Sequence, residues 1–194
     1  MGALCAHFLM DALRPFFILE VLMKQHSRKI AYSALIAAMY VALTHFQNLL
    51  IPGSATWAIQ FRASEALCVL AFFTPAAIPG LSIGCFLFNL TYSAALPLDM
   101  LVGTLATLLA TAGMYLTRKL TFQGIPVLGL LLPALTNAFL VGWELTVYIG
   151  GAFGLNALYV AIGEVAVLFT LGWILYSTMK KRGLDRRLFG ESAC

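Results

Sequence analysis

Charged side chains are scarce in this chain. Asp, Glu, Lys and Arg make up 10% of its 194 residues, whereas hydrophobic residues make up 61%. Soluble domains carry about 25% charged residues and about 45–50% apolar ones. This shortage of charge excludes an ordinary soluble domain and predicts an integral membrane protein.

The usual signatures of catalysis and metal binding are also missing. The sequence holds no GxxxxGK[ST] phosphate loop and no HExxH zinc motif. Its three histidines are scattered and its four cysteines form no CxxC pair, so we expect reduced thiols, no metal and no cofactor. We therefore do not expect an enzyme, nor ATP hydrolysis by a phosphate loop of this chain.

The few basic residues are unevenly placed. All but two of the twelve Lys and Arg residues fall into three groups: Lys24, Arg28 and Lys29; Arg118 and Lys119; and Lys180, Lys181, Arg182, Arg186 and Arg187. Basic residues that flank membrane spans are retained in the cytoplasm. The groups therefore predict that both termini are cytoplasmic. Because they flank apolar stretches rather than form one face, they do not indicate a nucleic-acid partner.

The apolar stretches between these groups predict an all-α protein of the plasma membrane with six transmembrane helices, at about 30–51, 64–77, 81–96, 100–117, 127–148 and 155–179. The second is the weakest, because Pro75 shortens it. A six-helix domain is thus expected over 24–182, with a basic cytoplasmic tail over 183–194. Residues 1–23 are interrupted by charges and a proline, and they form either a short interfacial helix or, as we prefer, an extension upstream of a true start at Met23.

Polar side chains gather in the outer half of this predicted bundle. Under the threading above, that half holds Gln47, Asn48, Gln60, Arg62, Glu65, Asn89, Asp99, Glu144, Tyr148, Asn156, Tyr159 and Glu164, with Asn137 nearer the middle. A carboxylate at the bilayer centre costs about 2.5–3.5 kcal/mol on insertion scales, so such residues are seldom kept without a use. Their confinement to one leaflet predicts a binding pocket that opens outward, and Glu144 and Glu164, which have no basic residue in their own spans, are its strongest candidates.

Some of these positions also have a purely structural explanation. Arg62 and Glu65 are three residues apart, so they could neutralise each other on one helix face. Asp99 follows Pro97 at a helix start, where it would be a natural N-cap. The aromatic residues at the outer level could belong to an interfacial belt or stack on a planar ligand: Trp57, Trp143, Tyr148 and Tyr159.

Small residues recur every four positions in three of the predicted helices. The strips are Ala34, Ala38 and Ala42; Ala106 and Ala110; and Ala134, Ala138 and Gly142. Such spacing lets another backbone approach closely, either within the bundle or from a partner protein. The spacing alone does not choose between the two.

Five segments, in order, resemble the QueT family. They are 60–67 (QFRASEAL), 73–81 (FTPAAIPGL), 99–109 (DMLVGTLATLL), Asn137 with 141–145 (VGWEL), and 163–165 (GEV). The resemblance covers about residues 24–182. It implies a substrate-binding S component of an energy-coupling factor transporter, which works with a transmembrane coupling subunit and two cytoplasmic ATPase subunits. It also implies that Ala34, Ala38 and Ala42 contact the coupling subunit.

The ligands that the resemblance implies are queuosine precursors, 7-deazaguanines such as queuine or its 7-aminomethyl form. A carboxylate can accept both the ring N–H and the exocyclic amine of a guanine edge, so Glu144 or Glu164 would bind that edge. A donor to the 6-oxo group would come from Arg62, Asn89, Asn137 or Gln60, and a stacking ring from Trp57, Trp143 or Tyr159. Arg62 and Glu65 would help to close the outer gate, and a cationic aminomethyl arm would need a second carboxylate.

Two other functions remain open from the sequence. The chain could be an S component for another small planar vitamin or base. It could also be a self-sufficient ion-coupled carrier, in which Glu144 or Glu164 would be the proton site. A membrane enzyme is the weakest alternative, because no nucleophile or metal set is present.

Overall fold

The computed structural model describes residues 2–52, 54, 61–92, 98–122 and 124–190. Over these residues the chain is helical and forms no strand. Its elements are α1 (Gly2–Leu50), η1 (Ala63–Phe72), α2 (Ala77–Thr91), α3 (Asp99–Thr117), α4 (Val127–Tyr148), α5 (Phe153–Val167), η2 (Leu168–Gly172), α6 (Trp173–Lys181) and α7 (Leu184–Phe189). The all-α class predicted from the sequence is confirmed.

Four helices of the described chain are long and apolar enough to cross a membrane: Gln25–Leu50 within α1, α3, α4, and the continuous segment Phe153–Lys181 of α5, η2 and α6. The other two apolar helices, η1 and α2, are shorter. At 1.5 Å per residue, the 15 residues of α2 rise about 22 Å, less than a hydrocarbon core of about 30 Å. A multi-pass membrane protein is supported, while six full spans and the threading stay predictions.

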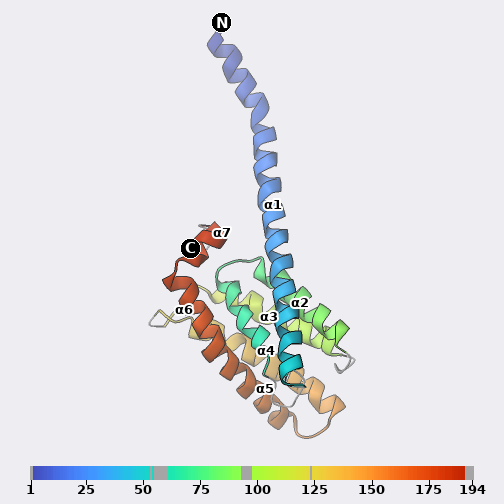
Figure 1. Cartoon of the computed structure of the whole chain (residues 1–194). Coiled ribbons are helices and arrows are strands. Elements are labelled where there is room, and N and C mark those ends of the chain that lie inside the picture. Colours follow the sequence, from blue (N-terminus) through green and yellow to red (C-terminus); the bar gives the residue numbers. More distant parts are fainter. Residues whose placement is uncertain (1, 53, 55–60, 93–97, 123, 191–194) are drawn as a thin grey trace.

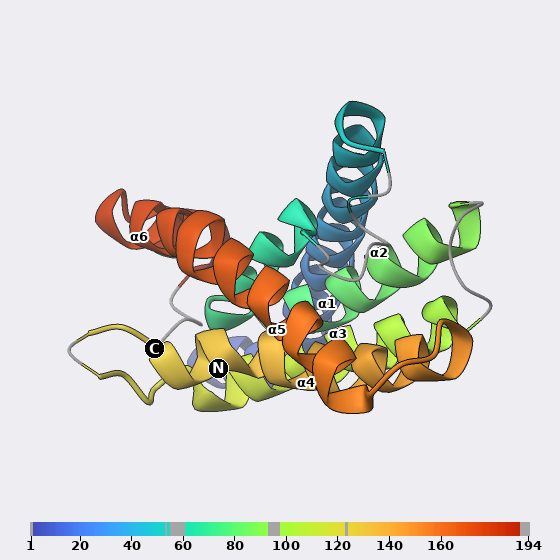
Figure 2. The ribbon, with the colours of Figure 1, turned by 90° about the horizontal axis from the view of Figure 1, so that it is seen from below.

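The segment predicted as the second span differs most from expectation. Ala63–Phe72 is a 3-10 helix rather than an α-helix, and all its residues except Ala63 are buried. It contacts α1 through α6 and occupies the middle of the bundle (Figure 2). A 3-10 helix rises about 2.0 Å per residue, so its ten residues cover roughly 20 Å. Long 3-10 runs are uncommon because their hydrogen bonds are poorer; here packing on every side supports one.

Close backbone contacts hold the helices around η1. A Cβ added to Gly80 of α2 would lie 2.7 Å from the Ser33 carbonyl of α1, and one added to Gly84 would lie 2.8 Å from Cβ of Tyr40. A Cβ on Gly142 of α4 would lie 2.8 Å from Cα of Ala157 in α5. Glycine at these positions lets the helices pack backbone to backbone.

The structure distinguishes the three small-residue strips. Ala106, Ala110 and Ala134 are buried and Gly142 packs on α5, so these strips are used inside the bundle. Ala34, Ala38 and Ala42 of α1 are all exposed. The α1 strip is therefore the one that the fold leaves exposed.

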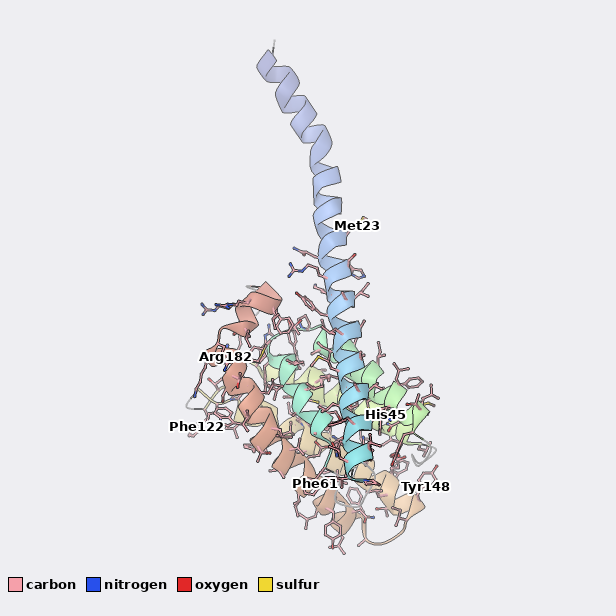
Figure 3. All side chains as sticks on the ribbon, in the orientation of Figure 1. Met23, His45, Phe61, Phe122, Tyr148 and Arg182 are labelled. Carbon is pink, nitrogen blue, oxygen red and sulfur yellow. The ribbon has the colours of Figure 1, made fainter. Side chains whose placement is uncertain are left out.

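The three basic groups lie toward one end of the bundle, which we call the basic end; Arg28 and Lys29 line a hollow there with Tyr115 and Phe189. Arg182 lies toward the side where α1 extends away from the bundle, whereas Phe61 and Tyr148 lie at the opposite end (Figures 1 and 3). Arg118 follows α3 at the basic end, and Asp99 begins α3 at the opposite end. At the basic end α7 folds back onto α1, where the Tyr32 hydroxyl donates a 2.6 Å hydrogen bond to the Leu188 carbonyl.

Candidate functional site

A cluster of buried polar side chains lies inside the bundle. Its members come from η1, α2, α3, α4 and α5, and none is more than 7% exposed: Arg62, Glu65, Asn89, Asp99, Asn137, Glu144 and Glu164. Six of the nine residues predicted to bind substrate are in it, and Asp99 joins them. Burying so many polar groups together is costly unless they serve one another or a ligand. We call this set the polar cluster.

Arg62 links the members of the cluster. It stands immediately before η1 in an extended conformation, which turns its guanidinium into the bundle. This group interacts electrostatically with Asp99 and Glu65, and also with Glu144 and Glu164. A single guanidinium therefore interacts with carboxyl groups from four elements, α3, α4, η1 and α5.

The deepest part of the cluster is the pair Asn137 and Glu164. The Asn137 amide donates a 2.9 Å hydrogen bond to Oε1 of Glu164. Both residues lie about three helical turns from the ends of their helices opposite the basic end, so α4 and α5 present them at the same level. Oε2 of Glu164 has no hydrogen-bond partner in the described chain and remains able to accept one.

Glu65 is held by residues that the sequence did not single out. Its Oε1 accepts a 2.7 Å hydrogen bond from the Tyr40 hydroxyl, and its Oε2 accepts one of 3.2 Å from the Cys68 thiol. One turn further along α1, Thr44 donates to the Ser64 hydroxyl at 2.7 Å. One face of α1 thus positions the start of η1. Only the four-residue spacing of Tyr40 and Thr44 hinted at this in the sequence.

Glu144 has no such support. Its side chain is 0% exposed, and within the described residues its carboxyl group meets no hydrogen-bonding group other than the neighbouring carboxyl of Asp99. It lies beside Asp99, with which it interacts electrostatically. Asp99 is not the N-cap that its position suggested: α3 begins at Asp99 itself, Leu98 is the capping position, and no side chain caps the helix. The Asp99 side chain is instead buried in the cluster.

Two of the predicted aromatic residues, Trp143 and Tyr159, do not join the cluster. Trp143 is 50% exposed and Tyr159 38% exposed, so both lie at the surface of the bundle, as the belt alternative expects. Gln60 and Trp57 lie outside the described residues. Ring stacking by Trp143 or Tyr159 stays a prediction that this placement does not favour.

Gly103 of α3 forms one wall of the cluster. A Cβ at this position would lie 3.1 Å from Nδ2 of Asn89, 3.5 Å from Sγ of Cys85 and 4.0 Å from Nη1 of Arg62. Asn89 in turn donates a 2.9 Å hydrogen bond to the Asp99 carbonyl. Glycine at this position lets the Asn89 side chain and its neighbours pack closely against α3.

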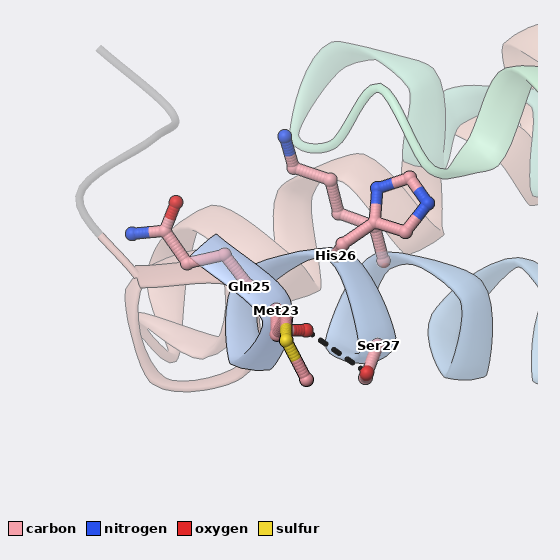
Figure 4. Close-up of a pocket in the computed structure, with 5 residues that line it drawn as sticks. Met23, Gln25, His26 and Ser27 are labelled. Carbon is pink, nitrogen blue, oxygen red and sulfur yellow. Dashed lines mark hydrogen bonds between the residues drawn. The ribbon is translucent and has the colours of Figure 1, made fainter. Parts of the chain in front are cut away.

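The hollows near the basic end are lined by no member of the polar cluster. One lies around the exposed residues Met23, Gln25 and His26, where the Ser27 hydroxyl donates a 2.9 Å hydrogen bond to the Met23 carbonyl (Figure 4). Another is an apolar groove of about 670 Å³ between α1 and α2, lined in part by Ala34, Ala38 and Pro79. The first is an exposed helix surface, whereas the second contains part of the exposed alanine strip.

Comparison with known families decides the class of this protein. The family model described as QueT transporter matches residues 30–181, a range that includes the whole polar cluster. The chain belongs to the QueT transporter family. No curated protein and no solved structure matches it. Membership of this family implies a membrane transporter with a small-molecule substrate, and the resemblance seen in the sequence is confirmed.

Proposed function

We propose that the chain is the substrate-capturing S component of an energy-coupling factor importer and binds a 7-deazaguanine precursor of queuosine from outside the cell. The observation that carries the proposal is the polar cluster, which buries carboxyl, amide and guanidinium groups in the part of the chain that matches the QueT family. In a membrane protein, buried ionisable groups facing the bundle interior are typical of a substrate path.

The chemistry of the cluster suits a guanine-like edge. Glu164, oriented by Asn137, offers an oxygen that has no partner in the described chain to the ring N–H and exocyclic amine of the base. Arg62 or Asn89 would donate to the 6-oxo group, which lies next to the ring N–H on the same edge of the base. Together they would bind one flat heterocycle by its edges, and Glu65 with Arg62 would close over it.

The energy for uptake would come from partner proteins in the plasma membrane. The sequence has no phosphate loop, so ATP would be hydrolysed by two cytoplasmic ATPase subunits that act through a transmembrane coupling subunit. We propose that the coupling subunit packs on the exposed strip of Ala34, Ala38 and Ala42, where small side chains permit close helix approach.

Binding to the purified full chain tests this proposal. Calorimetric titration with guanine, queuine and 7-aminomethyl-7-deazaguanine should show tight binding of at least one 7-deazaguanine and much weaker binding of guanine. Glu164→Gln should weaken the binding by about 10-fold or more, because hydrogen bonds to a charged acceptor contribute about 1.5–3 kcal/mol. Asp185→Asn, which removes a buried carboxylate at the basic end, is the matched control and should bind normally.

The ion-coupled carrier is separated from this proposal by uptake measurements. Cells that lack the ATPase subunits should take up no labelled 7-deazaguanine, and dissipation of the proton gradient alone should leave uptake by the complete system intact. Uptake that survives without the ATPases and collapses with the gradient would favour the carrier, with Glu144 or Glu164 as its proton site.

A further inference from the structure

Positive charge at the basic end is almost unopposed. The three basic groups hold ten Lys and Arg residues, and between positions 21 and 190 the chain has five acidic residues. Four of these acids belong to the polar cluster, so Asp185 is the one near the basic groups, and it is already paired with Lys180 at 3.3 Å. The other basic residues of this end are therefore not neutralised by an acid of that stretch.

Two of these cations line a polar hollow. Arg28 and Lys29 of α1 lie there with Tyr32, also on α1, and with Tyr115 of α3 and Phe189 of α7. The hollow has a volume of about 350 Å³, within the range of about 300–1,000 Å³ that is usual for small-molecule sites. None of the described residues that line it is acidic. The hollow is thus built from three helices and is not a patch of charge on a single one.

The Arg28 side chain is positioned to receive an anion. Its guanidinium carbon lies 5.9 Å from the centre of the Tyr32 ring, and its Nη2 donates a 3.3 Å hydrogen bond to the Tyr32 hydroxyl. Tyr32 is fixed in turn by its hydrogen bond to the Leu188 carbonyl and by an edge-on contact with Phe189. Because a guanidinium has five N–H donors, Arg28 can keep this contact and still donate to an oxyanion.

A third cation and a hydroxyl lie next to the same hollow. The Arg118 guanidinium carbon is 3.9 Å from the centre of the Tyr115 ring. The oxygen of the Thr74 hydroxyl, which also lines the hollow, accepts a 3.3 Å hydrogen bond from the Ala76 N–H, so its hydrogen is left to donate. Several cations and a hydroxyl donor, with no acid among them, suit a phosphate group.

The neighbouring groove indicates that this phosphate belongs to a lipid. The apolar groove between α1 and α2 shares two lining residues with the hollow, Lys29 and Pro75. A ligand with its anionic group beside Arg28 and Lys29 can therefore lay an apolar chain against α1 and α2. A phospholipid has both parts, whereas free phosphate would use only the polar one. Anionic lipids are also concentrated in the cytoplasmic leaflet, where the sequence predicts the basic end.

We propose that an anionic phospholipid binds at the basic end, with its phosphate in the hollow of Arg28, Lys29 and Tyr32. Its acyl chain lies against the adjoining end of the groove, next to Pro75. This site goes beyond the proposed function and does not rest on it, because none of its residues belongs to the polar cluster.

Binding of two lipids with the same acyl chains tests the site. The purified full chain in a neutral detergent is titrated with phosphatidylglycerol and with phosphatidylcholine, and bound lipid is measured by native mass spectrometry. Wild type should bind phosphatidylglycerol at least 10-fold more tightly, because each Lys or Arg at an anionic membrane surface contributes about fivefold. The double variant Arg28→Gln, Lys29→Gln should reduce this preference to about threefold or less.

A matched double variant separates a site from general attraction to positive charge. Lys181→Gln with Arg182→Gln removes the same charge from two exposed residues of the same end that do not line the hollow, and it should keep the preference. All four residues are exposed, so thermal unfolding and 7-deazaguanine binding should stay unchanged in both double variants.

Three results would overturn the lipid site. They are equal binding of the two lipids by wild type, equal loss of the preference in the two double variants, and displacement of phosphatidylglycerol by inorganic phosphate. The last would assign the hollow to a soluble anion. Each of them would leave the proposed function standing, which fails instead if no 7-deazaguanine binds.

Discussion

Asn137 and Glu164 lie 27 residues apart in sequence, yet the amide of one donates a 2.9 Å hydrogen bond to the carboxylate of the other. The contact joins α4 to α5 in the interior of the bundle, where both side chains are at most 5% exposed. It orients a carboxylate and at the same time stabilises the pairing of two helices.

Replacing Asn137 with Leu should therefore affect stability and binding together. The change leaves Glu164 buried without its donor, at a cost of about 1–3 kcal/mol of unfolding free energy. The apparent Tm in detergent should fall, and affinity for the 7-deazaguanine should fall by about 10-fold or more. Asn156→Ala is the control, since Asn156 is partly exposed and its bonds to Thr146 and the Gly150 carbonyl lie outside the cluster. A variant with wild-type affinity would show that Asn137 does not position a binding group.

Gly103→Ala should weaken binding more than it affects folding. The new Cβ would lie 3.1 Å from the amide nitrogen of Asn89, which must move, and it would fill space next to Arg62. We expect a loss of affinity of about 10-fold with little change in Tm, measured by titration and by thermal unfolding of the same samples. Gly154→Ala is the matched control, because a Cβ there meets nothing within 4 Å. Equal effects of the two substitutions would contradict the placement of Gly103 in the site wall.

Tyr40→Phe should destabilise the start of η1. The Tyr40 hydroxyl is fully buried and donates to Glu65 at 2.7 Å, so its removal leaves an acceptor without that donor, at a cost of about 1–3 kcal/mol. Tyr32→Phe removes a bond of similar length, 2.6 Å, to the Leu188 carbonyl, but in an exposed setting where water can replace it. Denaturant or thermal unfolding should show a clearly larger loss for Tyr40→Phe. The reverse order would mean that the α7 contact matters more than the packing of η1.

Much of the fold follows from the sequence because hydrophobic length and basic flanks are strong signals. The ends of α3 and α4 agree with the predicted spans within a residue or so. The 3-10 form of η1 could not be predicted, since apolar content does not distinguish a 3-10 from an α-helix. Only its burial among α1 through α6 selects that form, and this is a property of the tertiary structure.

The residue types of the candidate site were predictable from the sequence, but the directions in which all of its side chains point were not. Trp143 and Glu144 are adjacent, and successive helix positions point about 100° apart, so one can face inward while the other faces outward. The structure buries Glu144, as the cost of a carboxylate in lipid predicts, and exposes Trp143, for which the sequence left an interfacial belt and ring stacking open. Tyr40 was missed because a tyrosine in an apolar helix carries no charge signal, and Asp99 was assigned to a cap because its position at a helix start explained it.

Ala38→Trp on α1 should abolish uptake while leaving ligand binding intact. Ala38 is exposed on α1 and lines the groove beside α2, away from the polar cluster, so a bulky side chain there should not disturb the cluster. It would hold the coupling subunit off the strip and break the link to the ATPases. Uptake of labelled 7-deazaguanine by cells and co-purification of the coupling subunit should both fall at least 10-fold, while titration of the isolated chain stays within about twofold of wild type. Val147→Trp, which places the same bulk on an exposed site of α4, should leave all three measurements unchanged. If Ala38→Trp supported normal uptake and complex formation, the partner would have to bind another surface.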